Sequence, residues 1–469
     1  MKKIIICLII LISINYLQIF SQSHPDWYPI IGSSYIENKS YKLLERLCDE
    51  AGGRLVGSEV NEKALSILKE ELEKLNINSK FETFKIPGWV RENDEITMIA
   101  PTFRKLKTIA LGYVEKTNII ESNLIYAGHG YNEDYDSINV KDKIVIITQG
   151  GVPNKEEMLR YEAIEIAAKH GAKALLFIND KIGLVLLAGV SNFQGNPSLI
   201  PAFSISYEEG MWLERLLNDT IQVKLKINTN SYCKEIETSN VVVTFPGVVQ
   251  SKIVVGAHFD SWDKGQGAVD NGIGTATLFD LARLFKQFSP NNYFTVEFVW
   301  FNGEELGLWG SKKYMEAHKN DDIIAMINMD MTGSPTGFNA MGYDEFIPFF
   351  KSLIKDMNGF NLSAGVSSQP YTNSDHISFM FNGIPTFSMQ ATLDKDMYWY
   401  YHDAGDTFDK VSIRYLSDAS AIIGILIKEL ANNRNLPYKK YSKEETKALL
   451  LKYNLDKRLK RQKEWIFGD

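Results

Sequence analysis

The sequence has little cysteine, no excess of basic charge and no internal repeats. Only 3 of its 469 residues are cysteines, and Cys7 lies in an N-terminal apolar run. A disulfide in the rest of the chain would have to join Cys48 to Cys233, and the sequence leaves that open. The net charge is −7 with histidine neutral, which argues against a nucleic-acid-binding protein, because no domain-wide basic surface is available to neutralise phosphates.

The N-terminus has the features of a targeting segment. Lys2 and Lys3 precede an almost unbroken apolar run at 4–12, and Phe20-Ser-Gln22 is a plausible cleavage region. The run is short for a membrane-spanning helix, so we predict a signal peptide over residues 1–22, with an uncleaved anchor as the alternative. No cysteine ends the run, which argues against a lipid anchor. We therefore expect an exported protein, secreted or periplasmic, without stable membrane insertion after cleavage.

From Asn240 onward, apolar runs alternate with helical patterns. Repeated strand-then-helix order predicts an α/β fold with a mostly parallel mixed sheet and helices on both faces. The expected strands are 241–245, 253–257, 294–301, 323–329 and 386–389, and the expected helices are 275–288, 308–319, 345–357 and 412–431. Upstream, leucines at helical spacing predict a helix after Ser58, a residue suited to cap it, and then a strand at 81–86.

The sequence pattern changes between residues 87 and 235. Here short predicted strands alternate with loops and with a clear predicted helix at 156–169. A chain of 469 residues is long for one core, so two domains are expected. We predict an inserted lid domain at 87–235 and a discontinuous catalytic domain formed by 23–86 and 236–437. His129 and His170 stand alone in the lid, and we expect both to be structural or exposed.

The last segment, 438–469, is rich in Lys and Arg and contains Leu449, Leu450, Leu451 and Leu455. This pattern predicts an amphipathic helix docked on the body of the protein. A partner-binding role is the alternative.

The clearest candidate metal ligands follow the apolar run 253–255. His258 stands where that predicted strand ends, and Asp260 lies two residues on, so in extended backbone both point to the same side and Asp260 could support His258. Asp270 lies in a Gly-rich turn at the start of a helix, where free backbone donors hold carboxylates well. A hydrolytic two-metal site needs mixed nitrogen and oxygen ligands and one bridging carboxylate, and Asp270 is the best candidate for the bridge.

Other candidates follow later strands. Glu304 and Glu305 are adjacent, and the flanking Gly303 and Gly307 would let the backbone turn so that both reach one site. One could bind metal while the other acts as a general base. Asp330 follows the run at 323–329, and His402 lies in a polar loop after an aromatic cluster. Alone, such an Asp is usually a helix cap and a Glu-Glu pair is usually solvated; the complete set indicates a two-metal hydrolase.

These residues resemble the M28 family of co-catalytic zinc peptidases. The shared stretches are His258–Asp270, Trp300–Glu305, Ser374–Phe379, Gly383–Pro385 and His402 before Gly405-Asp-Thr407. Two further stretches, Arg54–Ser58 and Pro87–Arg91, are similar to a carboxypeptidase subgroup. The resemblance covers roughly residues 24–435 and leaves the tail out. It implies that the inserted block is a protease-associated domain that roofs the cleft.

The resemblance also implies individual roles. They are ligation of one zinc ion by His258 and Asp330, ligation of a second by Glu305 and His402, bridging by Asp270, general-base catalysis by Glu304 and orientation of His258 by Asp260. Some relatives have a tyrosine at the spacing of Tyr371 that steadies the tetrahedral intermediate, but the carboxypeptidase subgroup lacks a clear equivalent. Asp375 and His376 are expected to be structural or to support the ligands. Carboxylate-rich sites also accept cobalt or manganese.

The expected function is that of an exported di-zinc exopeptidase that hydrolyses dipeptides or short peptides, with a homodimer suggested by the resemblance. An aminopeptidase that releases N-terminal residues is the alternative within the same family. A glutaminyl cyclase would share the fold but use one zinc ion, and a catalytically dead binding protein would share it without the complete ligand set. Side-chain specificity depends on the shape of the pocket, which the sequence does not give.

Overall fold

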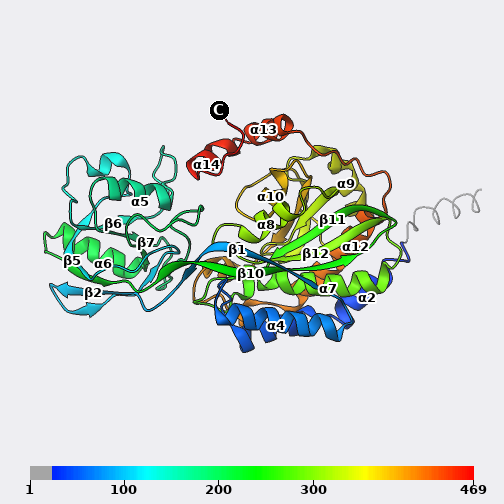
Figure 1. Cartoon of the computed structure of the whole chain (residues 1–469), viewed down its shortest axis with the longest axis horizontal. Coiled ribbons are helices and arrows are strands. Elements are labelled where there is room, and N and C mark those ends of the chain that lie inside the picture. The colour runs from blue at the N-terminus through cyan, green and yellow to red at the C-terminus, as the bar shows by residue number, and fades with distance from the viewer. Residues whose placement is uncertain (1–23, 469) are drawn as a thin grey trace, which may run out of the picture.

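The computed structural model describes residues 24–468, so the predicted signal peptide at 1–22 lies outside the described residues. Figure 1 shows two bodies joined by the long strands β1 and β10, with the C-terminal helices α13 and α14 above the junction. Within the described part of the chain, no helix is long and apolar enough to cross a membrane. Cys48 and Cys233 are both free thiols, so the disulfide left open by the sequence does not form.

The larger body is built on an eight-stranded mixed sheet in the order β1-β10-β12-β11-β13-β16-β14-β15. Its strands are β1 (Lys80–Val90), β10 (Tyr232–Phe245), β11 (Val249–His258), β12 (Phe294–Phe301), β13 (Ile323–Asn328), β14 (Ser334–Asn339), β15 (Gly365–Ser367) and β16 (Thr386–Thr392). The central four, β12, β11, β13 and β16, are parallel to one another. The predicted fold class, a mostly parallel mixed sheet with helices on both faces, is confirmed.

Helices cover this sheet on both faces, as expected for strands that are apolar on both sides. They are α2 (Tyr28–Ile36), α3 (Ser40–Arg46), α4 (Glu59–Lys74), α7 (Ile273–Phe288), α8 (Trp309–Ala317), α9 (Ile347–Asp356), α10 (His376–Met380), α11 (Lys395–Trp399) and α12 (Ile413–Asn432). In Figure 1, α4, α7 and α2 lie below the sheet, and α8 and α10 lie above it. Ser58 caps α4 as predicted, because its hydroxyl accepts the Asn61 N–H at 3.1 Å.

The smaller body is inserted between β1 and β10 and has its own eight-stranded sheet. Its elements are β2 (Glu95–Ala100), β3 (Arg104–Lys105), β4 (Thr108–Ala110), β5 (Ile120–Tyr126), β6 (Ile144–Thr148), α5 (Arg160–Lys169), β7 (Ala174–Ile178), β8 (Ala202–Ile205), α6 (Tyr207–Asn218) and β9 (Lys224–Asn228). We call this body the lid. Its apolar core continues into the larger body, because Trp262 and Leu306 pack within it.

The predicted single helix of the tail is two short helices, α13 (Lys443–Lys452) and α14 (Leu455–Arg461). Asn454 separates them in a left-handed backbone conformation, with φ of 56°. Leu449, Leu450 and Leu459 are buried in the main core of the larger body. The tail also contacts the lid, since Arg461 Nε lies 2.7 Å from Glu162 on α5. The tail is therefore docked on both bodies.

Candidate metal centre

The candidate ligands gather because their strands are neighbours. Strands β12, β11 and β13 are adjacent and parallel, so their carboxyl ends lie at one edge of the sheet, which is where open α/β sheets place their sites. His258 is the last residue of β11, and Asp330 follows β13 by two residues. Glu304 and Glu305 follow β12 in the same way. Three separate segments thus deliver their polar side chains to one place.

Two groups of potential ligand atoms share the Asp270 carboxylate. His258 Nε2 lies 3.1 Å from Asp270 Oδ1 and 3.4 Å from Asp330 Oδ1. His402 Nε2 lies 3.0 Å from Asp270 Oδ2 and 3.1 Å from Glu305 Oε2. The ligand atoms of each group lie within 4.8 Å of one another. Each carboxylate oxygen of Asp270 therefore faces a different group.

These separations fit zinc. Nitrogen and oxygen ligands bind zinc at about 2.0–2.2 Å, which puts two ligands of a tetrahedral site roughly 3.4 Å apart. Glu305 Oε1 is buried and, among the described residues, has no hydrogen-bond partner. Against the effect of burial, the Glu305 and Asp270 carboxylates raise the pKa of His402 to about 10. Crowded buried carboxylates with an orphaned oxygen are the environment that bound cations stabilise.

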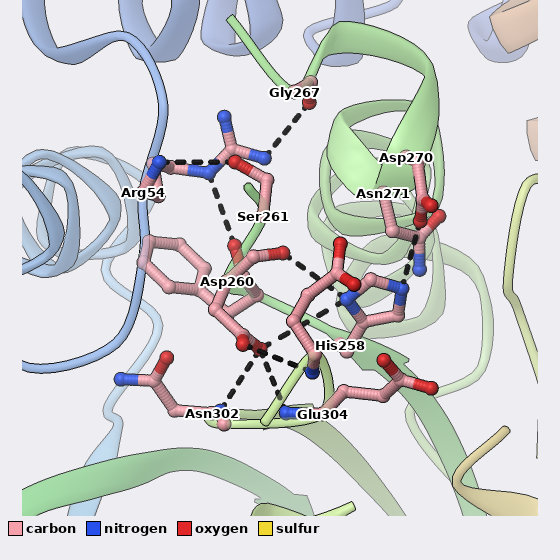
Figure 2. A network of polar contacts seen from close by, with 12 residues as sticks. Arg54, His258, Asp260, Ser261, Gly267, Asp270, Asn271, Asn302 and Glu304 are labelled. Carbon is pink, nitrogen blue, oxygen red and sulfur yellow. Dashed lines mark hydrogen bonds and ion pairs between the residues drawn. The ribbon is translucent and has the colours of Figure 1, made fainter. Parts of the chain in front are cut away.

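Asp260 holds the Glu304–Glu305 turn from behind. Its Oδ1 accepts the N–H groups of Gly303 at 2.9 Å and Glu304 at 3.0 Å, and its Oδ2 accepts the Glu305 N–H at 3.2 Å (Figure 2). The Asp260 carboxylate oxygen is 3.9 Å from His258 Nδ1, whereas the Asp260 backbone carbonyl is 3.1 Å from that nitrogen. The residue thus contacts His258 through its backbone and orients the two glutamates through its side chain.

The two glutamates reach the same cleft because the backbone around them turns. Gly303 and Gly307 both have left-handed backbone, with φ of 94° and 127°, which other residues rarely adopt. Both glutamate side chains line the cleft, which has a volume of about 650 Å³, within the range of small-molecule sites. Burial raises the pKa of Glu304 well above its usual value. A carboxyl group with a raised pKa is suited to take up and return a proton.

The other candidates lie around this cleft. Tyr371 lines it, and its backbone carbonyl lies 2.8 Å from His376 Nε2. Asp375 and His376 are fully buried beside the ligands and belong to neither group. The Asp270 carboxylate contacts both imidazoles and, within residues 24–468, accepts no backbone N–H, unlike the helix-start arrangement we expected.

Several supporting residues carried no role in the sequence analysis. Asp406 accepts the N–H groups of Val269 at 2.7 Å and Asp270 at 3.0 Å, and so fixes the backbone of the shared carboxylate. Arg54 is fully buried and donates to the carbonyls of Phe259, Gln266 and Gly267, which holds the loop between β11 and α7 together. Figure 2 shows the bond to Gly267. Asp406 and Arg54 both occur in stretches quoted for the family resemblance, which was the only available signal.

The His402 loop is attached to the lid. His402 Nδ1 lies 3.3 Å from the Ala188 carbonyl, and the Ala188 N–H donates to the His402 carbonyl at 3.0 Å. The Leu186 N–H donates to Asp403 at 2.7 Å. Tyr401 stacks on His402 with ring centroids 3.7 Å apart, and it lines the cleft. The lid therefore helps to position a predicted metal ligand.

Comparison with known proteins matches this chain to two families. The family model described as Peptidase family M28 matches residues 240–426, and the PA domain model matches residues 116–213. Mouse carboxypeptidase Q is 27% identical over 83% of this chain and 85% of that protein. Aminopeptidase YwaD of Bacillus subtilis is 26% identical over 87% of this chain and 88% of that protein.

Solved structures share the fold. The peptidase M28 precursor of Shewanella amazonensis superimposes with a TM-score of 0.74 at 22% identity, covering 88% of this chain and 98% of that one. BSAP, a zinc aminopeptidase from Bacillus subtilis, gives a TM-score of 0.70 at 22% identity, with coverage of 84% and 95%.

Proposed function

Because this chain is a metallopeptidase of family M28 with an inserted PA domain, we propose that it is an exported two-zinc exopeptidase that hydrolyses dipeptides or short peptides. The observation that carries the proposal is the Asp270 carboxylate, whose two oxygens face two separate groups of ligand atoms. One group is His258, Asp270 and Asp330, and the other is Asp270, Glu305 and His402. The N-terminal segment that follows Lys2 and Lys3 supports export.

In this proposal the chain's residues have distinct tasks. When bound, the zinc ions supply Lewis-acid polarisation of the scissile carbonyl and a lowered pKa of the attacking water. Glu304 accepts the proton of that water and donates it to the leaving amine. Asp260 holds Glu304 in place through the backbone N–H bonds already described. Tyr371 and Tyr401, which both line the cleft, are the candidate donors to the oxyanion.

An aminopeptidase is the second candidate, and the similarity to aminopeptidase YwaD over 87% of this chain favours it. The two candidates differ in the peptide end that must be free. Dipeptides with blocked amino or carboxyl ends, assayed with and without a chelator, separate them. Cleavage of N-blocked dipeptides supports a carboxypeptidase. A need for a free amine supports an aminopeptidase, and a need for both free ends supports a strict dipeptidase.

The general-base assignment is tested with Glu304→Gln. The substitution keeps the shape of the side chain and removes its capacity to accept a proton. We expect kcat to fall by about 10²–10⁴-fold while the zinc content, measured by elemental analysis, stays at two ions per chain. Dipeptide hydrolysis at the wild-type rate would show that another group takes the proton.

A further inference from the structure

Arg160 is a cationic side chain of the cleft that has no counter-ion among the described residues. Arg160 is the first residue of α5 in the lid, and it lines the cleft together with the candidate metal ligands. Its only hydrogen bond to another described residue runs from Nη1 to the Ala188 carbonyl, at 3.3 Å. No carboxylate among residues 24–468 lies within ion-pair distance of it. Partly buried arginines are usually paired, because their planar guanidinium carries five N–H donors that need acceptors.

Arg160 contacts the same lid loop that contacts His402. The Ala188 carbonyl that accepts from Arg160 also lies 3.3 Å from His402 Nδ1. The Ala188 oxygen thus contacts both the Arg160 guanidinium and the His402 imidazole, whose other nitrogen faces Asp270 and Glu305. The guanidinium lies over the backbone of Gly189, where any side chain would collide with Nη1. The bare backbone at Gly189 therefore makes room for the guanidinium.

Among the described residues, the cleft is lined by two arginines, Arg160 and Arg458, and is otherwise rich in carboxylates. On the floor, two bound zinc ions would neutralise Asp270, Glu305 and Asp330, which leaves Glu304 as a free carboxylate. The acidic groups that influence Arg160 directly are Glu157 and Asp180, both exposed at the rim. A substrate anion entering the cleft would be repelled by these groups unless it met a fixed cation. A guanidinium with free donors is well matched to a carboxylate, which it can bind in a bidentate way.

We propose that Arg160 binds the C-terminal carboxylate of the peptide substrate and so selects substrates with a free C-terminus. This inference rests on the proposed exopeptidase function. One residue spans at most about 3.5 Å, so the carboxylate of a dipeptide lies close to its scissile carbonyl. A carboxylate anchor for dipeptides must therefore stand next to the metal centre, as Arg160 does. In longer peptides the C-terminal carboxylate would lie beyond Arg160, towards Leu459 and Gln462 of the tail, which also line the cleft.

The test compares the zinc-loaded, full-length protein with Arg160→Gln and Arg160→Lys on alanyl-leucine and alanyl-leucine amide. For wild type we expect a clear preference in kcat/KM for the free acid. In Arg160→Gln this preference should fall by about 10- to 100-fold, through a higher KM for the acid, while hydrolysis of the amide is unchanged. Arg160→Lys, which keeps the charge but not the fork of donors, should retain part of the preference.

Arg458→Gln is the matched control, because Arg458 also lines the cleft and has no ion-pair partner among the described side chains. Direct recognition predicts that this variant keeps the full preference for the acid. The proposal is overturned if Arg160→Gln keeps the preference, if it slows both substrates equally, or if Arg458→Gln matches it. Calorimetric binding of both peptides to Glu304→Gln, with and without Arg160→Gln, should show the same loss of affinity for the acid alone. Chelator-insensitive or absent cleavage by wild type would instead overturn the exopeptidase proposal itself.

Discussion

At the scale of single residues, Asp260 contacts the backbone of the two glutamates of the candidate centre. Its carboxylate accepts three N–H groups from the turn that carries Glu304 and Glu305. In Asp260→Asn, one oxygen becomes an NH₂ group that faces an N–H donor, so the turn must shift. We expect kcat/KM to fall by about 10- to 100-fold with no loss of overall fold, measured by dipeptide hydrolysis and circular dichroism.

Asp263→Asn provides the comparison, since Asp263 lies in the same loop. Its carboxylate contacts Arg91 Nε at 2.7 and 3.0 Å and touches neither glutamate. This variant should keep activity within a few-fold of wild type. Equal losses in the two variants would mean that Asp260 supports the loop in general and has no particular role in placing the glutamates.

The residues of the candidate centre were predictable where their chemistry and position along a strand coincided. His258, Glu304, Glu305 and Asp330 all follow apolar strands, and parallel strands bring such positions together. Arg160 was not predictable in this way, because its role depends on a missing counter-ion. His402 has a left-handed backbone, with φ of 57°, which no local sequence signature predicts.

At the scale of elements, the lid loop 186–190 and the His402 loop stabilise each other. Asp403 accepts the Leu186 N–H at 2.7 Å and the Gly405 N–H at 2.9 Å. Asp403→Ala removes both bonds, and His402 should become less well oriented. We expect the affinity of the His402 group for zinc to fall about tenfold while the His258 group keeps its ion, as measured by zinc stoichiometry in metal buffers.

Asp409→Ala serves as the reference for this experiment. Asp409 is exposed and contacts only Thr407 and Lys410 among the described residues. Its removal should leave zinc binding unchanged. If Asp403→Ala also leaves both ions in place, the lid contact does not contribute to the metal centre.

The tail offers a direct comparison of two adjacent leucines. Leu450 on α13 is fully buried, whereas Leu451 is 43% exposed. Leu450→Ala leaves a cavity in the main core, so we expect a loss of about 2–5 kcal/mol in the free energy of unfolding, measured with denaturant. Leu451→Ala should change it by less than about 0.5 kcal/mol. A similar small effect for both would mean that the tail is not part of the cooperative fold.

The sequence predicted elements with a continuous apolar pattern better than elements that lack one. Helices α7 and α12 and strands β12 and β13 match the expected ranges to within about two residues, because each has a long apolar pattern. Strands β14 and β15 were not predicted. The segment Ser334–Asn339 of β14 contains Pro and Gly, and it forms a strand by pairing with β15 and β16. The tail was expected to be one helix, and the break at Asn454 arises where it turns to reach the lid.

At the scale of the whole molecule, the pH dependence of stability should reflect a contact between β1 and α8. His318 Nε2 lies 3.0 Å from Glu82, and His318 Nδ1 lies 2.7 Å from Asp321. Burial opposes ionisation of Glu82, but hydrogen bonds from His318 and Lys80 lower its pKa from 4.5 to about 2. Burial also opposes protonation of His318, yet Glu82 and Asp321 raise its pKa above 6.5.

The signs of these two shifts define a pH window. The Glu82 contribution is present above pH 4.5 and is lost as the pH falls towards 2, whereas the His318 contribution is present below pH 6.5 and is lost as the pH rises through its raised pKa. We expect His318→Gln to lower the free energy of unfolding by about 1 kcal/mol between pH 4.5 and 6.5, and by less outside this range. Lys85→Gln, an exposed change on the same strand, should not lower the free energy of unfolding more between pH 4.5 and 6.5 than outside this range.

The β1–β10 ribbon determines how the lid can move. The two strands pair without a break from Lys80 opposite Val242 to Val90 opposite Tyr232, so both covalent connections of the lid run through a single ladder. A two-stranded ribbon is compliant to bending across its face and stiff to shear along its strands, because sliding would break every ladder hydrogen bond at once. The ribbon by itself would let the lid bend about one axis only, and the shared core at Trp262 and Leu306 and the tail contact between Arg461 and Glu162 oppose that bend.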